Sequence, residues 1–220
     1  MSVAFSSMAQ RHVVKRKHKP IKISKRKASV VCPIFNESQY PYQGIGVKLG
    51  DPFAITYKFY ANKNFAIAVD AGSAASGLYN QYHTDNFSEG IRPDTLNQAQ
   101  SISYLSHIVN SEWVMEGKML YQHDASKLLK GLQWYVGAGF QWRQVDITYE
   151  YLLDISFSTS ETGRFDVTNS TMGPTAVLGF EYAYFQLPIS AFMEVELFTD
   201  IDNDPGWTRF QGGIGLRVVF

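Results

Sequence analysis

Cysteine, long apolar runs and net charge are all scarce in this 220-residue sequence. The single cysteine, Cys32, excludes a disulfide within the chain and a metal cluster held by several thiolates. The longest purely apolar runs are about five residues, as at 65–69, whereas a membrane-spanning helix needs about 20. A helical membrane protein is therefore excluded. A spanning β-barrel is not, because each of its strands gives only a weak hydropathy signal.

The zero net charge conceals an uneven distribution. Residues 11–27 hold nine of the 20 Lys and Arg residues and no acid, which leaves 11 bases against 20 acids elsewhere. Such a segment is typical of a solvated linker or of a contact with an anionic surface. We predict that residues 10–43 form a basic periplasmic segment that can contact cell-wall polymer or a partner protein. Nucleic acid is not an expected partner of a secreted chain.

The first residues carry part of a secretion signal. Ser7 and Ala9 stand at the −3 and −1 positions of a cleavage site before Gln10. The apolar stretch before them is short and lacks a charged start, so residues 1–9 are predicted to be the remnant of a signal peptide that begins upstream of Met1. A mitochondrial presequence is the alternative. Acylation of Cys32 is disfavoured because basic residues precede it.

Apolar and polar residues alternate with period two over much of the remaining chain, which is the pattern of half-buried β-strands. Turn signals at 50–52 and 62–64 separate the first alternating segments. Longer polar stretches at 76–111, 144–170 and 200–207 are predicted to be loops, with a short helix within 96–109. Eight strands are predicted in a barrel domain at 44–220, and they lie at 45–49, 53–59, 65–71, 113–121, 132–143, 176–184, 189–197 and 210–220.

The two faces of these strands differ in composition. One carries Phe, Ile, Leu, Val and Tyr, and the other carries glycines and balanced charges. Eight strands closed into a barrel leave an interior that side chains just fill, and a Lys or Arg at a lipid-facing strand centre costs about 2–4 kcal/mol. We therefore predict an all-β, eight-stranded antiparallel transmembrane up-and-down β-barrel with a charged lumen. The predicted lumen charge network is Lys48, Lys58, Asp70, Glu116, Lys118, Arg143, Glu181, Glu194, Glu196 and Arg217.

Aromatic residues gather near the ends of the predicted strands, as they do at the two interfaces of a membrane barrel. The last strand is predicted to pair with the first, because lipid cannot hydrate an open sheet edge. This pairing places Phe220 at the inner interface. The predicted membrane girdles consist of Phe59, Phe65, Trp113, Tyr121, Trp134, Trp142, Tyr184, Phe210 and Phe220.

Several stretches resemble known proteins. The closing stretch FQGGIGLRVVF resembles the signal that the bacterial barrel assembly machinery recognises. The stretches GIGVKLGDPFAITYKFY, LYQHDASKLLKGLQWYVGAGF and VLGFEYAYFQLPISAFMEVEL resemble a family of small outer-membrane β-barrel proteins frequent in Bacteroidota. This resemblance covers about 44–72 and 113–220 and implies an OmpA-like or OmpX-like barrel in the bacterial outer membrane. It also implies outer-membrane lipid, lipopolysaccharide and the assembly machinery as partners, but no common chemistry.

Some small outer-membrane barrels are enzymes, which need a Ser–His–acid set or paired acids near one membrane face. His83 with Asp85 nearby, and His107 beside Ser106, lie in a predicted outer loop and are the candidates for such a set. Ordinary loop histidines are the simpler interpretation. Glu194 and Glu196 are predicted to be structural partners of Arg143 and Arg217 rather than general acids.

A metal site is also considered and disfavoured. Asp200, Asp202 and Asp204 alternate as in a calcium loop, but Gln211 stands where the bidentate Glu is needed. We predict no catalytic residue, no metal and no cofactor. The predicted function is a non-enzymatic structural or interaction role in the outer membrane. The alternatives are a lipid A deacylase or acyltransferase and a soluble lipocalin-like ligand-binding barrel.

Overall fold

The structure is a computed structural model, which describes residues 40–74, 79–87, 101–156, 159–184 and 187–220. The predicted signal remnant at 1–9, Cys32 and nearly all of the basic segment at 10–43 lie outside the described residues. In the part of the chain that is described, no helix has the length and apolarity needed to cross a membrane.

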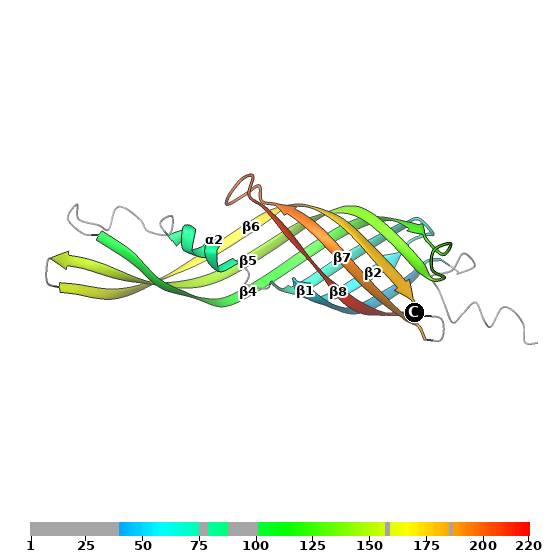
Figure 1. Ribbon diagram of the computed structural model, residues 1–220, viewed down its shortest axis with the longest axis horizontal. Helices are drawn as coiled ribbons and strands as arrows, with labels where there is room; N and C mark the ends of the chain where they lie inside the picture. Colours follow the sequence, from blue (N-terminus) through cyan, green and yellow to red (C-terminus); the bar gives the residue numbers. More distant parts are fainter. Residues whose placement is uncertain (1–39, 75–78, 88–100, 157–158, 185–186) are drawn as a thin grey trace, which may run out of the picture.

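Eight antiparallel strands form one closed barrel, in which each strand pairs with its neighbours in sequence and β8 pairs with β1 (Figure 1). Backbone hydrogen bonds between Gln43 and Phe220, at 2.8 and 2.9 Å, complete the closing seam. The predicted all-β, eight-stranded up-and-down ring is thus confirmed. The strands are β1 (Tyr42–Asp51), β2 (Phe53–Tyr60), β3 (Phe65–Ser73), β4 (Ser101–Asp124), β5 (Leu132–Ser156), β6 (Thr159–Ala183), β7 (Ile189–Thr199) and β8 (Thr208–Val219).

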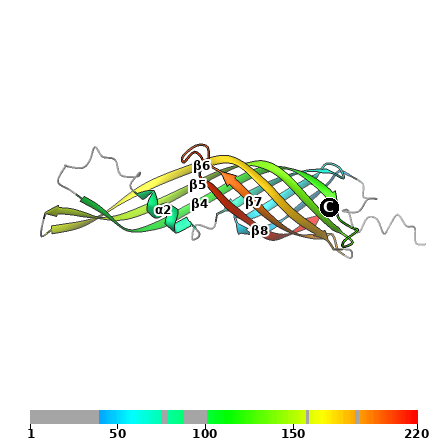
Figure 2. The ribbon, with the colours of Figure 1, turned by 45° about the horizontal axis from the view of Figure 1, so that its top comes forward.

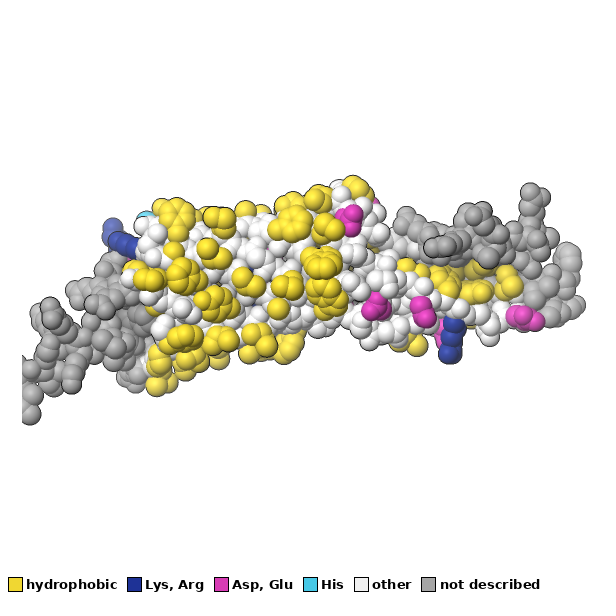
Figure 3. Space-filling model, turned by 180° about the vertical axis from the view of Figure 1, so that it is seen from behind, with side chains coloured by type: hydrophobic (Ala, Val, Ile, Leu, Met, Phe, Trp, Pro, Cys, Tyr) yellow, Lys and Arg dark blue, Asp and Glu magenta, His cyan; other side chains and the backbone are white. Residues whose placement is uncertain are grey.

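Side chains on the barrel strands alternate between a buried interior and an exposed outer wall. In β2, Phe53 and Ile55 are exposed, whereas Ala54, Thr56 and Lys58 are buried. Figure 3 shows hydrophobic side chains spread over the outer wall of the barrel. Most of the large apolar residues of the barrel therefore lie outside and the charged residues inside, which is the reverse of a barrel that folds in water.

Three strands continue well past the barrel. β4, β5 and β6 have 24, 25 and 25 residues, and their far halves form a three-stranded sheet that projects from one end (Figures 1 and 2). We call this sheet the extension, comprising residues 101–113, 144–156 and 159–171. The predicted loop at 144–170 is therefore wrong. The predicted helix within 96–109 is also wrong where it can be compared, because residues 101–109 belong to β4.

The extension has a small core of its own. Val145, Ile147 and Tyr149 are buried on its inner face, where Phe87 contacts the Tyr149 ring at a centroid distance of 5.6 Å. The short helix α2 (Asn80–Asp85) precedes Phe87 and lies against the same sheet, and the Tyr149 hydroxyl donates to the backbone oxygen of His83 at 2.8 Å. Apolar residues alternate along 145–149 in the sequence, but the residues between them are polar, and the stretch therefore resembled a loop.

Glycine makes room for a large aromatic side chain inside the barrel. A Cβ at Gly179 would lie 2.4 Å from Cζ of Tyr135. The Tyr135 side chain is fully buried, and its hydroxyl donates to Glu194 at 2.9 Å. The Tyr135 ring is attached to the backbone of β5 at one end and hydrogen-bonded to Glu194 at the other. It cannot move aside without breaking that hydrogen bond.

We expect Gly179→Ala to lower the free energy of unfolding by about 1–3 kcal/mol, because the new methyl group and the Tyr135 ring cannot share one space. Gly117→Ala is the matched control, since a Cβ there meets no atom within 4 Å. It should be neutral or slightly stabilising. Equilibrium urea unfolding in detergent measures both variants, and equal losses would contradict the packing described.

Candidate functional site

All ten side chains predicted for the lumen charge network lie inside the barrel, and none is more than 3% exposed. They carry five positive and five negative formal charges. A buried charge is tolerated when it is paired and hydrogen-bonded, and is very costly otherwise. The partners of these groups therefore determine whether the charged interior is stable.

Lys118 is the centre of the largest group. Its Nζ lies 2.6 Å from carboxylate oxygens of Asp70 and Glu196, 3.0 Å from Glu194 and 3.5 Å from Glu116. These acids come from three strands, β3, β4 and β7. One ammonium group thus ties together strands from different sides of the barrel.

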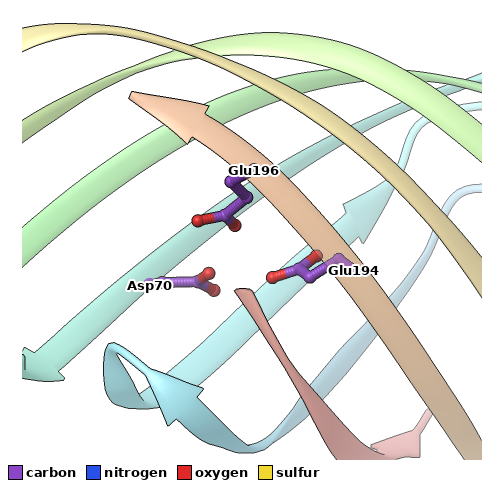
Figure 4. Close-up of side chains that lie close together, drawn as sticks. All are labelled: Asp70, Glu194 and Glu196. Atoms are coloured by element: carbon purple, nitrogen blue, oxygen red, sulfur yellow. The ribbon is translucent and has the colours of Figure 1, made fainter. Parts of the chain in front are cut away.

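Lys48 contacts three of the same acids. Its Nζ lies 3.0 Å from Glu194 and Glu196 and 3.2 Å from Asp70. Figure 4 shows the three carboxylates converging on one point, and their oxygens are close enough together to hold a metal ion. Two lysine ammonium groups already supply positive charge at that point, so the geometry is that of an ion-pair cluster.

Glu181 organises a second group. It forms salt bridges with Lys58 at 2.6 Å and with Arg217 at 3.7 Å. It also accepts hydrogen bonds from Tyr60 at 2.5 Å and Ser190 at 2.6 Å. The two groups together account for nine of the ten predicted charges, all of them paired inside the barrel.

Arg143 and the β7 acids have partners other than those predicted. Glu194 and Glu196 form salt bridges with lysines rather than with Arg143 or Arg217, and Arg143 pairs with Glu112 on β4. Glu112 was not among the predicted lumen residues, because the strand was predicted to begin at Trp113. Its even position, in phase with the other interior residues of β4, was the available signal.

The predicted girdle residues all lie on the outer surface, six of them exposed and Phe59, Trp113 and Trp134 partly exposed. They form ring contacts at both ends of the barrel. Phe65 meets Tyr121 at a centroid distance of 5.5 Å near the short turns, and Trp113 meets Trp142 at 4.7 Å where the barrel joins the extension. An apolar wall with aromatic contacts at its two ends is typical of barrels in membranes.

The outer face of β5 changes character where the barrel ends. Phe140 and Trp142 point outward from the barrel and are exposed. Beyond them, Val145 and Ile147 are buried in the extension, and Asp146 takes the outward position. The same strand is thus apolar outside in the barrel and apolar inside in the extension.

Strand β6 shows the same change. Leu178 and Phe180 are exposed on the barrel wall, whereas Phe165 and Val167 pack into the extension core. Outward-facing Asp146 accepts hydrogen bonds from Ser111 at 2.5 Å and Thr168 at 2.7 Å, which links all three strands by polar contacts. The outer face of the sheet is therefore mostly apolar along the barrel and mostly polar along the extension.

The histidines considered as catalytic candidates meet on the inner face of the extension. The rings of His83 and His107 have a centroid distance of 5.5 Å, and the Tyr104 hydroxyl lies 2.7 Å from Nδ1 of His107. Ser106 lies on the opposite face of the strand, where its hydroxyl donates a hydrogen bond to the Glu150 carboxylate at 2.7 Å. The Ser106–His107 pair considered as a catalytic candidate is therefore not formed.

Asp85 does not complete a catalytic set either. It accepts a hydrogen bond from Gln81 at 3.0 Å, and both ring nitrogens of His83 lack a hydrogen-bond partner among the described residues. A catalytic histidine needs a group that fixes its tautomer and orientation. The described geometry gives His83 a role in packing rather than in proton transfer.

Burial, reinforced by the nearby His107 and Arg143, lowers the pKa of His83 to about 4. The unfolded segment has a pKa near 6.5, so it binds more protons than the folded one between about pH 6.5 and 4, and packing of α2 weakens as the pH falls through that window. We expect amide exchange in α2, corrected for intrinsic rates, to accelerate from pH 7 to pH 5. His83→Gln should remove the acceleration and His123→Gln, at an exposed site, should not. An unchanged response in His83→Gln would contradict this assignment.

No protein-family model matches the sequence, and no curated protein matches it. The crystal structure of the N-terminal β-barrel domain of Pseudomonas aeruginosa OprF is similar over 82% of this chain and 96% of that chain, at 11% identity and a TM-score of 0.43. The crystal structure of Acinetobacter baumannii CarO is similar over 82% of this chain and 98% of that chain, at 10% identity and a TM-score of 0.34. The strand pairing of this chain itself defines it as a closed eight-stranded β-barrel.

Proposed function

We propose that this chain is an integral protein of the bacterial outer membrane with a non-enzymatic structural or interaction role. The observation that carries the proposal is the change of face along β5 and β6. Apolar residues such as Leu178 (53% exposed) and Ile214 (58% exposed) lie on the barrel wall. Their exposure to water is unfavourable, and their contact with lipid would be favourable. The extension, with its mostly polar outer face, is suited to the aqueous side. The resemblance to Bacteroidota barrels agrees with this proposal.

The filled interior favours a structural role over transport. Eight strands leave no free passage once side chains fill the interior. Here Lys118 and Lys48 cross-link acids of β3 and β7, and Lys58 and Arg217 bind Glu181 nearer the short turns. Moving a solute through the barrel would require these buried pairs to separate. The barrel is better suited to hold the extension in place.

The extension is the part that we propose to meet partners. It carries α2 on its inner face and exposes Leu105 and Ile108 on β4, at 48% and 56% exposure. Register shifts at 104/106 and 109/111 interrupt the ladder on each side of these residues. Such bulges re-aim side chains and blunt strand edges. Lipid and lipopolysaccharide would surround the barrel, from which the extension projects.

Fractionation and gel electrophoresis test the membrane assignment. The chain, expressed with a secretion signal, should be recovered in outer membranes and migrate faster before boiling than after it, because the closed barrel resists detergent. Recovery as a soluble periplasmic protein without a heat shift would contradict the proposal and favour the lipocalin-like alternative.

A lipid analysis tests the non-enzymatic role. Cells that express the double variant His83→Gln, His107→Gln should have the same lipid A structures as cells that express the wild-type chain. Loss of a lipid A modification in the double variant, with the barrel still heat-modifiable, would favour the lipid-modifying enzyme instead.

A further inference from the structure

A small pocket lies at the end of the barrel that bears the extension. Its walls come from elements far apart in the sequence, which are the start of α2, β5, β6 and the β7–β8 connection with β8. The polar and aromatic residues that line it include Tyr79, His83, Arg143, Thr171, Trp207 and Arg209. Arg143 was predicted as a lumen charge and His83 was considered as a loop histidine, but no sequence pattern placed them at one site.

Arg209 is the unusual feature of this pocket. It is 7% exposed, and its guanidinium donates to the amide oxygens of Gln211 at 3.0 Å and Gln141 at 3.1 Å. No carboxylate within the described ranges forms a salt bridge with it, in contrast to the cations deeper in the barrel. A buried guanidinium whose only hydrogen-bond acceptors are neutral amides is strongly disfavoured unless an anion joins it.

Other unused donors point to the same place. Arg143 binds Glu112 through Nη2, while its Nε and Nη1 have no partner among the described residues. The hydroxyl of Thr171 and both ring nitrogens of His83 are likewise buried without partners there. Several buried donors around one pocket indicate an acceptor-rich ligand.

Both guanidinium groups lie close to the same aromatic ring, that of Tyr79. The guanidinium carbons of Arg143 and Arg209 lie 4.6 and 5.2 Å from the centroid of the Tyr79 ring, and the Tyr79 hydroxyl is hydrogen-bonded to Asp51. The acids near the pocket, Glu112 and Asp51, are thus already engaged. Two like charges on one ring repel each other, and an anion bound between them would relieve that repulsion.

We propose that this pocket binds a small oxyanion of the phosphate or carboxylate class through Arg209, Arg143 and Thr171. These residues are buried within the sheet and do not face its apolar outer wall, so the occupant enters from the aqueous end. It is a free anion, or the anionic end of a soluble molecule, rather than a lipid headgroup. The proposal holds wherever the barrel resides and does not rest on the proposed function.

Titration with inorganic phosphate tests the site in the full chain, refolded in a zwitterionic detergent at constant ionic strength. We expect a saturable change in tryptophan fluorescence that Trp207→Phe abolishes, because Trp207 lines the pocket. Arg209→Gln should raise the dissociation constant by at least about tenfold, since it removes a charge-assisted contact. Arg164→Gln is the matched control. Arg164 is 74% exposed and pairs with Glu150 in the extension, so its loss should change binding less than about twofold.

Three outcomes would overturn the proposal. The first is wild-type affinity in Arg209→Gln, and the second is no saturable response of the wild-type chain to phosphate or acetate. The third is an Arg209-dependent response to phosphatidylglycerol micelles with none to free phosphate, which would place the source in the lipid. The heat shift on gels verifies that each variant is folded. Should Arg209→Gln fail to fold, Thr171→Val removes a single hydroxyl and must weaken phosphate binding for the proposal to stand.

Discussion

Lys118→Met is expected to lower the free energy of unfolding by about 3–5 kcal/mol, because it leaves buried carboxylates without their counter-ion. Lys118 Nζ contacts four acids within 3.5 Å, and all of these side chains are essentially inaccessible to solvent. Lys48 remains to neutralise only part of the cluster. Denaturant titration of the refolded barrel measures the loss.

Lys63→Met is the matched control for that variant. Lys63 lies exposed in the turn between β2 and β3, so the same chemical change should alter stability by less than about 0.5 kcal/mol. If the two variants lost similar amounts, the buried cluster would not be a stabilising feature. The Lys48→Met, Lys118→Met double variant should cost more than the sum of the singles, because in each single variant the remaining lysine still neutralises part of the shared acids.

Leu178→Arg is expected to destabilise the barrel in a bilayer by about 2–4 kcal/mol, the cost of an arginine at the midplane of a lipid-facing strand. Leu178 is exposed near the middle of the barrel wall, where it pairs with Val136 and Val195. A water-facing position would accept the same arginine at little cost, so the size of the effect reports the solvent outside the barrel.

Ile108→Arg is the control for this prediction. Ile108 is also an exposed apolar residue on a strand, at 56% exposure, but it lies in the extension. We expect its replacement to change stability by less than about 0.5 kcal/mol. Unfolding titrations in phospholipid bilayers compare the two variants. A loss for Ile108→Arg as large as that for Leu178→Arg would place the extension in lipid as well.

The barrel could be predicted from sequence because its lipid-facing and interior faces differ in charge. Charged residues such as Lys48, Lys58 and Glu181 fall on the interior face of the barrel strands, whereas the outer face of those strands carries apolar residues without charges at the strand centres. That parity defines the strands and their interior side chains without knowledge of the pairing. It also fixes eight strands, which is the number that the structure contains.

The extension escaped prediction because its rule is inverted. Val145, Ile147 and Tyr149 alternate as regularly as the barrel residues, but their outward neighbours include Asp146 and Thr148. A segment of that polarity resembles a loop unless a change of solvent along one strand is considered. Recognising the change of face after Trp142 would have lengthened β5.

Partners and pockets depend on contacts that no local pattern encodes. Glu194 is bound by Lys48 and Lys118, which are far from it in sequence, and nothing in its neighbourhood distinguishes them from Arg217. Arg209 is in phase with the other interior residues of β8, so its burial was predictable. Its place beside Arg143 and Tyr79 depends on how α2 closes the mouth of the barrel.

Spin labels at two outward positions of β5 test the central claim most directly. Phe140→Cys and Asp146→Cys lie six residues apart, about 20 Å along the strand, and Cys32→Ser in both makes the label unique. In reconstituted bilayers, we predict that the label at 140 collides with dissolved oxygen and is shielded from a polar nickel reagent. The label at 146 should show the opposite preference. Equal access of the polar reagent to both labels would contradict a membrane boundary between them.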